Sequence, residues 1–196
     1  MVVRKVLDET KKNYLKVSDL FTSTFTTTYQ FILQQVMLSN IRRAMEKDFE
    51  TVLKIYFDEE NNYYLNYNPM KKEEFRKIWN DMVARKHTYV CEMLGDVIGF
   101  ISASSPEGQG QHVAHITPIV VRKEFRGFGV SKKLMRYILK KLREEGFKRV
   151  DLEVNADNKR GIKFFKKFGF EREATMKKNV KKGGRYYDDY LMVKFF

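Results

Sequence analysis

One short segment limits the possible folds of this chain more than any other. An apolar stretch, residues 119–121, leads into a glycine-containing turn at residues 126–131, and a helix is predicted from there to residue 145. Such a turn points several backbone N–H groups and a helix N-terminus at one place, which suits a phosphate group. Taken alone, it leaves three interpretations open. A dinucleotide-binding turn would need a third glycine where Lys132 stands, a P-loop would need its lysine at another spacing, and a structural turn would hold no ligand.

The residues on either side of the turn predict a mixed fold of helices and strands. Apolar residues recur at helical spacing over residues 49–57, 71–85, 131–145 and 159–168, and Asp48 is placed to cap the first of these helices. Strand-like runs cover residues 41–44, 88–93, 97–103, 112–121, 149–154, 174–180 and 186–195. This order, a meander that leads into a βαβ unit, is typical of an α/β or α+β fold.

The first 40 residues are predicted to form a helical extension of a main domain at residues 41–196. Apolar residues from Val17 to Val36 recur at helical spacing, so this helix is expected to pack against the main domain or against a second subunit, which leaves a homodimer open. Residues 20–41 carry no charge, but eleven of these 22 residues are Ser, Thr, Asn or Gln. A membrane-spanning helix would bury too many polar groups there, so we expect no membrane partner.

Composition narrows the class of partner. The net charge of +13 lies entirely in residues 111–196, where 23 Lys and Arg stand against 10 Asp and Glu. Such an excess suits a phosphorylated ligand or a nucleic acid, or it forms only a solvated surface. No motif interleaves aromatic and basic residues, so a nucleic acid is not expected. The single cysteine, Cys91, and the lack of an apolar secretion signal in residues 1–12 predict a cytoplasmic protein.

Several motifs in a consistent order resemble the GNAT superfamily of N-acetyltransferases. The turn is similar to the family's Arg/Gln-x-x-Gly-x-Gly/Ala cofactor loop and reads Arg126-Gly127-Phe128-Gly129-Val130-Ser131. A strand, an asparagine and a helix that ends in Gly-Phe follow at residues 152–170, and residues 186–192 are similar to the family's last strands. The resemblance covers residues 41–196. It implies a GNAT-type central mixed sheet flanked by helices, and transfer of an acetyl group from acetyl-CoA to a primary amine.

The resemblance also implies which residues bind acetyl-CoA. The loop amides would hold the pyrophosphate, the preceding strand would pair with the pantetheine and polarise the thioester carbonyl, and Asn158 would hydrogen-bond the pantetheine arm. Phe165 stands where many members have a tyrosine that donates a proton, so the identity of the general acid is open. The implied site comprises Ile119, Val120, Val121, Arg126, Gly127, Phe128, Gly129, Val130, Ser131, Asn158 and Phe165.

Two residues are the candidates for catalysis. Glu153 is similar in position to the general base of ribosomal-protein-type members, although it could equally pair with a neighbouring Lys or Arg. Tyr187 is the candidate acid in place of the missing tyrosine, with Tyr186 and Tyr190 as alternatives, and each of these could instead be a packed strand residue. The three histidines are not at metal-ligand spacing, so no metal is expected, although His115 could reach the acceptor.

The acceptor amine stays open at the level of sequence. In this family the first two helices and the loop between them line the acceptor groove, and here that loop contains Asp58, Glu59, Glu60, Tyr63, Tyr64 and Tyr67. Carboxylates with tyrosines suit a cationic amine, and a solvated acidic loop is the alternative. A peptide or protein α-amine and a small cationic amine are both compatible. We expect direct attack in a ternary complex, and the alternative is a non-catalytic CoA-sensing or interaction module, which Phe165 favours.

Overall fold

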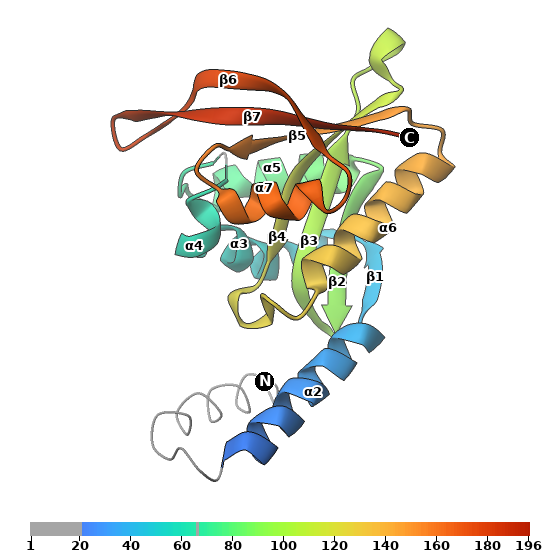
Figure 1. Cartoon of the computed structure of the whole chain (residues 1–196), viewed down its shortest axis with the longest axis vertical. Coiled ribbons are helices and arrows are strands. Elements are labelled where there is room, and N and C mark those ends of the chain that lie inside the picture. The colour runs from blue at the N-terminus through green and yellow to red at the C-terminus, as the bar shows by residue number, and fades with distance from the viewer. Residues whose placement is uncertain (1–20, 66) are drawn as a thin grey trace.

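The computed structural model describes residues 21–65 and 67–196, whose strands form a seven-stranded sheet (Figure 1). The strands are β1 Asn40–Arg43, β2 His87–Met93, β3 Asp96–Ser104, β4 Val113–Val121, β5 Arg149–Asn155, β6 Glu171–Lys182 and β7 Arg185–Phe195. Their order across the sheet is β1-β2-β3-β4-β5-β7-β6, and neighbours are antiparallel except β4 and β5, which run parallel. The mixed sheet expected from the sequence, a meander followed by a βαβ unit, is confirmed.

Helices cover both faces of this sheet (Figure 1). They are α2 Phe21–Leu38, α3 Phe49–Tyr56, α4 Glu59–Asn62, α5 Lys72–Ala84, α6 Val130–Glu144 and α7 Lys159–Lys166, with 3-10 turns at Glu46–Asp48, Gly108–Gly110 and Lys123–Phe125. On the α3 and α5 side, Phe75 and Trp79 are fully buried against Phe100, and on the α6 side Leu134 is buried with Ile98. Strands β2 and β3 are therefore buried along nearly their whole length, because both of their faces are covered.

Helix α2 is attached to the sheet by its C-terminal end. Ile32 and Val36 are buried in the core shared with α6, whereas Phe31 is 49% exposed. Lys133 of α6 donates hydrogen bonds to the carbonyl oxygens of Val36, Met37 and Ser39, which satisfies carbonyls at the end of the helix. A helix is thus found from Phe21 onward, and the first members of the predicted apolar spacing, Val17 and Leu20, lie outside the described residues. No helix in the described part of the chain is both long and apolar enough to cross a bilayer.

The prediction that the side chain of Asp48 caps α3 is wrong. Asp48 does stand at the N-cap position, but its carboxylate makes no capping hydrogen bond. Instead it accepts from the backbone N–H of Met45 at 2.9 Å and from both terminal nitrogens of Arg42 at 2.8 Å. Burial would raise the pKa of Asp48, but these hydrogen bonds and the charge of Arg42 outweigh it and hold the pKa below its usual value. The aspartate ties β1 to the turn before α3.

Candidate active site

The parallel strands β4 and β5 separate partway along their length. They pair only at residues 113–115 and 149–151. Beyond that point β4 continues along β3 to Val121, and β5 continues along β7 to Asn155. A cavity of about 750 Å³ opens between the separated ends. Its volume lies in the range of small-molecule and cofactor sites. The separation of β4 from β5 therefore determines where the candidate site lies.

The glycine turn after β4 lies at one side of this cavity. Gly127 and Gly129 have φ angles of 92° and 93°, left-handed values that favour glycine. A Cβ atom built on either glycine would meet nothing within 4 Å, so the backbone conformation requires glycine and the space beside the turn is open. Among the described residues no side chain caps the first turn of α6. The N–H groups of that turn are therefore left for an anion, and the turn fits a phosphate group.

Helix α7 lines the opposite part of the cavity. Asn158 is its N-cap and accepts a hydrogen bond from the backbone N–H of Gly161 at 2.8 Å through Oδ1, so its Nδ2 is the group left to donate to a ligand. A Cβ on Gly161 would lie 2.7 Å from that Nδ2, and glycine therefore lets the asparagine side chain sit over the helix start. Phe165 is 8% exposed and packs against Phe164 and Phe170. Its apolar ring therefore lines the cavity at the position where the resemblance implies a tyrosine hydroxyl in many members.

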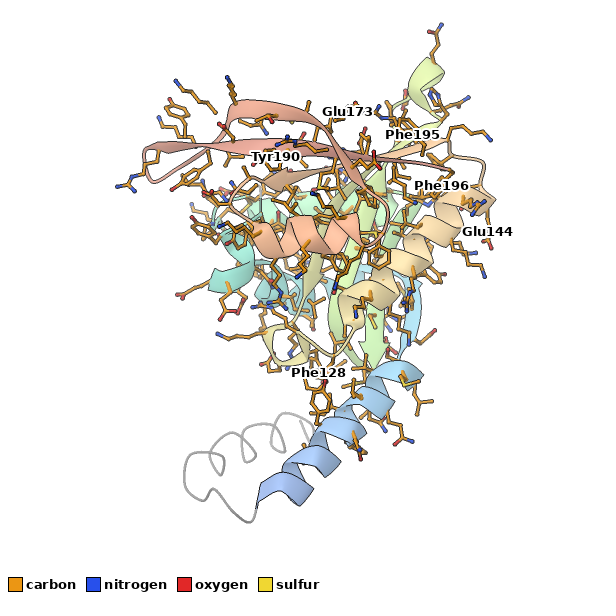
Figure 2. The ribbon with its side chains drawn as sticks, viewed as in Figure 1. Phe128, Glu144, Glu173, Tyr190, Phe195 and Phe196 are labelled. Carbon is orange, nitrogen blue, oxygen red and sulfur yellow. The ribbon has the colours of Figure 1, made fainter. Side chains whose placement is uncertain are left out.

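Most of the residues assigned to acetyl-CoA surround the same cavity. Those that line it are Ile119, Val120, Val121, Arg126, Gly127, Val130, Ser131, Asn158 and Phe165. Phe128 and Gly129 belong to the same turn but are not among the lining residues. The ring of Phe128 instead packs against Tyr29 of α2 with 5.1 Å between ring centroids, on the α2 side of the loop that precedes α6 (Figure 2).

The side chain of Arg126 points away from the place where a phosphate would bind. Its guanidinium donates to Asp58 at 2.6 Å and to Glu60 at 2.5 Å, and its Nε donates to the carbonyl oxygen of Val121 at 3.2 Å. Lys123 pairs with Glu60 as well, at 2.5 Å. The arginine side chain thus fastens the acidic segment before and within α4 to the turn, and its backbone N–H donates to the carbonyl oxygen of Lys123 at 3.3 Å.

These ion pairs change the interpretation of the acidic segment. The hydrogen bond and charge of Lys123 lower the pKa of Glu60. Burial would raise the pKa of Asp58, but the hydrogen bond and charge of Arg126 outweigh it and lower the pKa. Both carboxylates are therefore ionised and already neutralised by cations of the same chain, so they are poorly suited to bind a cationic amine.

Glu153 lines the cavity on β5, at the place where β5 has left β4. It is half-buried, and its Oε2 accepts a hydrogen bond from Asn179 of β6 at 3.3 Å. No Lys or Arg forms an ion pair with it among the residues that the structure describes. The ion pair that was the alternative to a catalytic role is therefore not seen there.

Tyr187 lies beside the cavity and not in its lining. Its side chain is hydrogen-bonded to that of Tyr63, which does line the cavity. The neighbouring Tyr187, together with burial and this hydrogen bond, raises the pKa of Tyr63, so the Tyr63 hydroxyl stays protonated at neutral pH. Lys182 of the β6–β7 hairpin donates a hydrogen bond to the carbonyl oxygen of Tyr63, and its Nζ lies 5.2 Å from the centre of the tyrosine ring. The hairpin is thus fixed to the segment after α4.

The other polar side chains on the exposed face of β4 and β5 form a separate cluster. His115 contacts Asp151 with 2.7 Å between Nδ1 and Oδ1, and Arg149 bridges Asp151 to Glu173. His115 is not part of the cavity lining. Across the described ranges, no three His, Cys, Asp or Glu residues are placed to share a metal ion.

Sequence reasoning missed three side chains of this region. Asn179 and Lys182 of β6 donate hydrogen bonds to Glu153 and to the carbonyl oxygen of Tyr63, and Asp189 of β7 accepts a hydrogen bond from Asn179. No local pattern marks them. The charge run at residues 177–182 reads as an ordinary solvated surface, and the asparagine within it carries no signal of its own.

Comparison with known proteins identifies the family of this chain. The model of the acetyltransferase (GNAT) family matches residues 46–170. The L-amino acid N-acetyltransferase AaaT of Escherichia coli is 31% identical over 163 residues, which cover 79% of this chain and 96% of the relative. The uncharacterized N-acetyltransferase MJ1207 of Methanocaldococcus jannaschii is 28% identical over 142 residues, which cover 70% of this chain but only 62% of that relative's length. The chain therefore belongs to the GNAT family of acetyltransferases, whose members are acyltransferases, and the resemblance is confirmed.

Solved structures show the same fold. A ribosomal-protein-alanine N-acetyltransferase from Brucella melitensis superimposes with a TM-score of 0.71 at 25% identity and covers 80% of this chain and 99% of its own. A phosphinothricin acetyltransferase from Sinorhizobium meliloti, solved in complex with acetyl-CoA, has a TM-score of 0.69 at 21% identity, with 81% and 88% of the two chains covered. At 21% identity, the similarity to the Sinorhizobium enzyme shows only that the two chains share a fold.

Proposed function

We propose that this chain is an acetyl-CoA-dependent N-acetyltransferase whose acceptor is the α-amino group of an amino acid or a peptide. The observation that carries the proposal is the cavity between the separated ends of β4 and β5, with the uncapped start of α6 at one part of its wall and Glu153 at another. One wall suits a phosphate and the other suits an amine, so the cavity can hold a donor and an acceptor at once. Direct transfer in a ternary complex needs that arrangement.

The donor half of the cavity binds through backbone groups. The N–H groups of Arg126 and Phe128 already donate to the carbonyl oxygens of Lys123 and Phe125, so those of Gly127 and of the start of α6 hold the pyrophosphate, and Nδ2 of Asn158 donates to the pantetheine arm. The carbonyl of Val121 already accepts from Asn61 and Arg126, so strand-like pairing with the pantetheine falls to the remaining backbone groups of residues 119–121, one of which polarises the thioester carbonyl. Acetyl-CoA supplies an activated acyl group on a thiol leaving group.

The acceptor half carries the proton chemistry. Glu153 takes the proton that the amine loses as it attacks, directly or through a water molecule. Tyr187 supplies a proton through its hydrogen-bonded neighbour Tyr63, which faces the cavity. The acid contributes little to the rate, because a thiol with a pKa of about 8.5 leaves largely as thiolate. The absence of a hydroxyl at Phe165 is therefore compatible with turnover.

An α-amine suits this cavity better than a polyamine. A second cationic centre would need free carboxylates, but Asp58 and Glu60 are paired with Arg126 and Lys123. The α-amine of a peptide also has a pKa of about 7.7–8.0, so a sizeable fraction is neutral at physiological pH, whereas a lysine-type amine at about 10.4 is almost wholly protonated. The names of AaaT, an L-amino acid N-acetyltransferase, and of the Brucella enzyme, a ribosomal-protein-alanine N-acetyltransferase, point the same way.

Turnover with matched amines tests this proposal. CoA release is followed with a panel of free L-amino acids, short peptides with free N-termini, the same peptides with blocked N-termini, and spermidine. We expect CoA release with an amino acid or a free N-terminus, and none with the blocked peptides. Turnover with spermidine alone would overturn the choice of acceptor. Binding of acetyl-CoA without turnover of any amine would favour the CoA-sensing alternative.

A further inference from the structure

A bulge in β6 directs one side chain across the hairpin onto β5. The pairing of β6 with β7 jumps from Met176 opposite Asp189 to Val180 opposite Tyr187, so residues 177–179 have no partner in the ladder. Lys178 has a φ of 55°, and its N–H donates to Asp188 Oδ1 at 2.8 Å, which fixes the shape of the bulge. Bulges often re-aim a side chain beside a functional site.

The bulge directs the side chain of Asn179 toward Glu153 of β5 and Asp189 of β7. Its Nδ2 donates to Oε2 of Glu153 at 3.3 Å and to Oδ2 of Asp189 at 3.0 Å. Ionised carboxylates only accept hydrogen bonds, so the amide must present its nitrogen, with one N–H for each partner. A single carboxamide therefore joins two acidic side chains from different strands.

Asp189 gives this link an unusual anchor. The residue is 3% exposed, and its Oδ1 has no hydrogen-bond partner among the described residues, so Asn179 supplies the one side-chain donor recorded for this carboxylate. A buried carboxylate with an unpaired oxygen destabilises a fold. Stability of the hairpin therefore does not account for an aspartate here, whereas a fixed acceptor that orients the Asn179 amide does.

We propose that Asn179, anchored by Asp189, is a positioning residue that holds Glu153 as the base for the acceptor amine. This inference rests on the proposed function. Glu153 is half-buried and has several rotamers, and a hydrogen bond to Oε2 selects the one that leaves Oε1 for the amine proton. The reaction gains from this tether because a small displacement of a catalytic group lowers the rate steeply. Asn179 itself does not touch the acceptor.

The test compares two substitutions at the exposed residue 179 with a neighbour on the same bulge. Asn179→Ala removes the amide, Asn179→Asp keeps its size but has no N–H to donate and repels both carboxylates, and Lys177→Ala is the control. We expect kcat/KM for the acceptor to fall about tenfold in Asn179→Ala and at least as far in Asn179→Asp. The dissociation constant of acetyl-CoA should match that of Lys177→Ala, whereas the unfolding temperature should be lower, because the buried Asp189 loses its side-chain donor. Activity like that of the control in both variants would overturn the proposal.

A double-mutant cycle separates positioning from a structural role. If Asn179 acts through Glu153, then Asn179→Ala in a Glu153→Gln background should lower kcat/KM by no more than about twofold further. Independent, multiplying losses would overturn the proposal, since a purely structural effect of the hairpin would persist without the base. Suppose that the wild type is active, Glu153→Gln loses most activity and Asn179→Ala has normal activity. That result would refute the positioning role of Asn179 and leave the proposed function standing. A wild type inactive on every α-amine would refute the proposed function, and this inference with it.

Discussion

The two halves of the cavity are built in different ways. The donor half comes from one continuous stretch, residues 119–131, together with the start of α7, and it presents backbone groups held by glycines and an asparagine cap. The acceptor half is assembled from α4, the tip of β5 and the β6–β7 hairpin, and it presents side chains whose positions depend on contacts such as Asn179 with Glu153. A backbone site for a fixed donor and a side-chain site for a variable acceptor can change independently of one another.

The difference predicts where substitutions act. Changes at the turn should weaken binding of acetyl-CoA and leave the chemistry intact, whereas changes in the acceptor half should slow turnover and leave that binding intact. A variant at the turn that slows turnover, or a variant in the acceptor half that weakens binding of acetyl-CoA, would show that the halves are coupled. Arg126 is a place where such coupling can arise. It belongs to the turn, and its side chain contacts the carboxylates of Asp58 and Glu60 in the acidic segment.

The largest effect is expected from the base. Glu153→Gln keeps the shape of the side chain but cannot accept a proton, so kcat/KM for the acceptor should fall by roughly 100-fold or more. Calorimetry should give the same dissociation constant for acetyl-CoA as the wild type. Glu173→Gln is the matched control, because Glu173 is a carboxylate of β6 that pairs with Arg149 and lies outside the cavity lining. Near-normal turnover in Glu153→Gln would remove the base from the account.

The next effect belongs to the turn. Gly127→Ala places a Cβ on a residue with a φ of 92°, which is strained by about 1–2 kcal/mol, so the loop should relax and lose about tenfold in affinity for acetyl-CoA. Gly146→Ala is the control, since Gly146 has a φ of 86° and equally open surroundings but lies beyond α6, outside the cavity lining. Both variants should lose similar thermal stability, and only the first should lose affinity. Equal affinities would mean that the turn does not bind the donor.

A much smaller effect is expected from the acidic segment. Glu60 is already paired with Lys123 and Arg126, so Glu60→Gln should change the KM of the acceptor by no more than about twofold. Glu59→Gln, in the same short helix, serves as the control. A tenfold rise in KM that is confined to Glu60→Gln would show that this carboxylate binds the amine after all, and the comparison of the two halves would need revision.

The smallest effect concerns stability and not the site. Burial lowers the pKa of His87, although Glu145 partly opposes this, so the folded state favours the neutral imidazole. The contribution is fully present above the unfolded-state pKa of about 6.5 and is lost as the pH falls from there through the folded-state pKa. The free energy of unfolding should therefore decline on acidification below pH 6.5, and His87→Gln should flatten that part of the curve. An unchanged curve in chemical denaturation would contradict this assignment.

The donor half could be read from the sequence because its determinants are local. The apolar strand, the two glycines and the helix lie within residues 119–145, and their spacing alone places backbone N–H groups at the helix start. The outcome for Arg126 shows the limit of such reading. The motif predicts its place at the start of the turn, but its side chain pairs with Asp58, 68 residues away, which no local pattern reveals.

The acceptor half could not be predicted in the same way. The link from Asn179 to Glu153 depends on the register shift in β6, and that register is set by pairing with β7 and not by the residues of β6 alone. Asp48 failed as a cap for a related reason, because Arg42 of the neighbouring strand competes for its carboxylate. In both cases a partner on another secondary-structure element decides where a polar side chain points, although Arg42 lies only six residues from Asp48.

Calorimetric titration of the wild-type chain with acetyl-CoA, beside NAD and ATP, tests the central claim most directly. The account predicts saturable one-to-one binding of acetyl-CoA, weaker or absent binding of the two other nucleotides, and a loss of affinity in Gly127→Ala that Gly146→Ala does not share. Folded protein that binds no acetyl-CoA, or that binds all three ligands equally, would contradict the account, because the turn between β4 and α6 would then be no specific site for the donor.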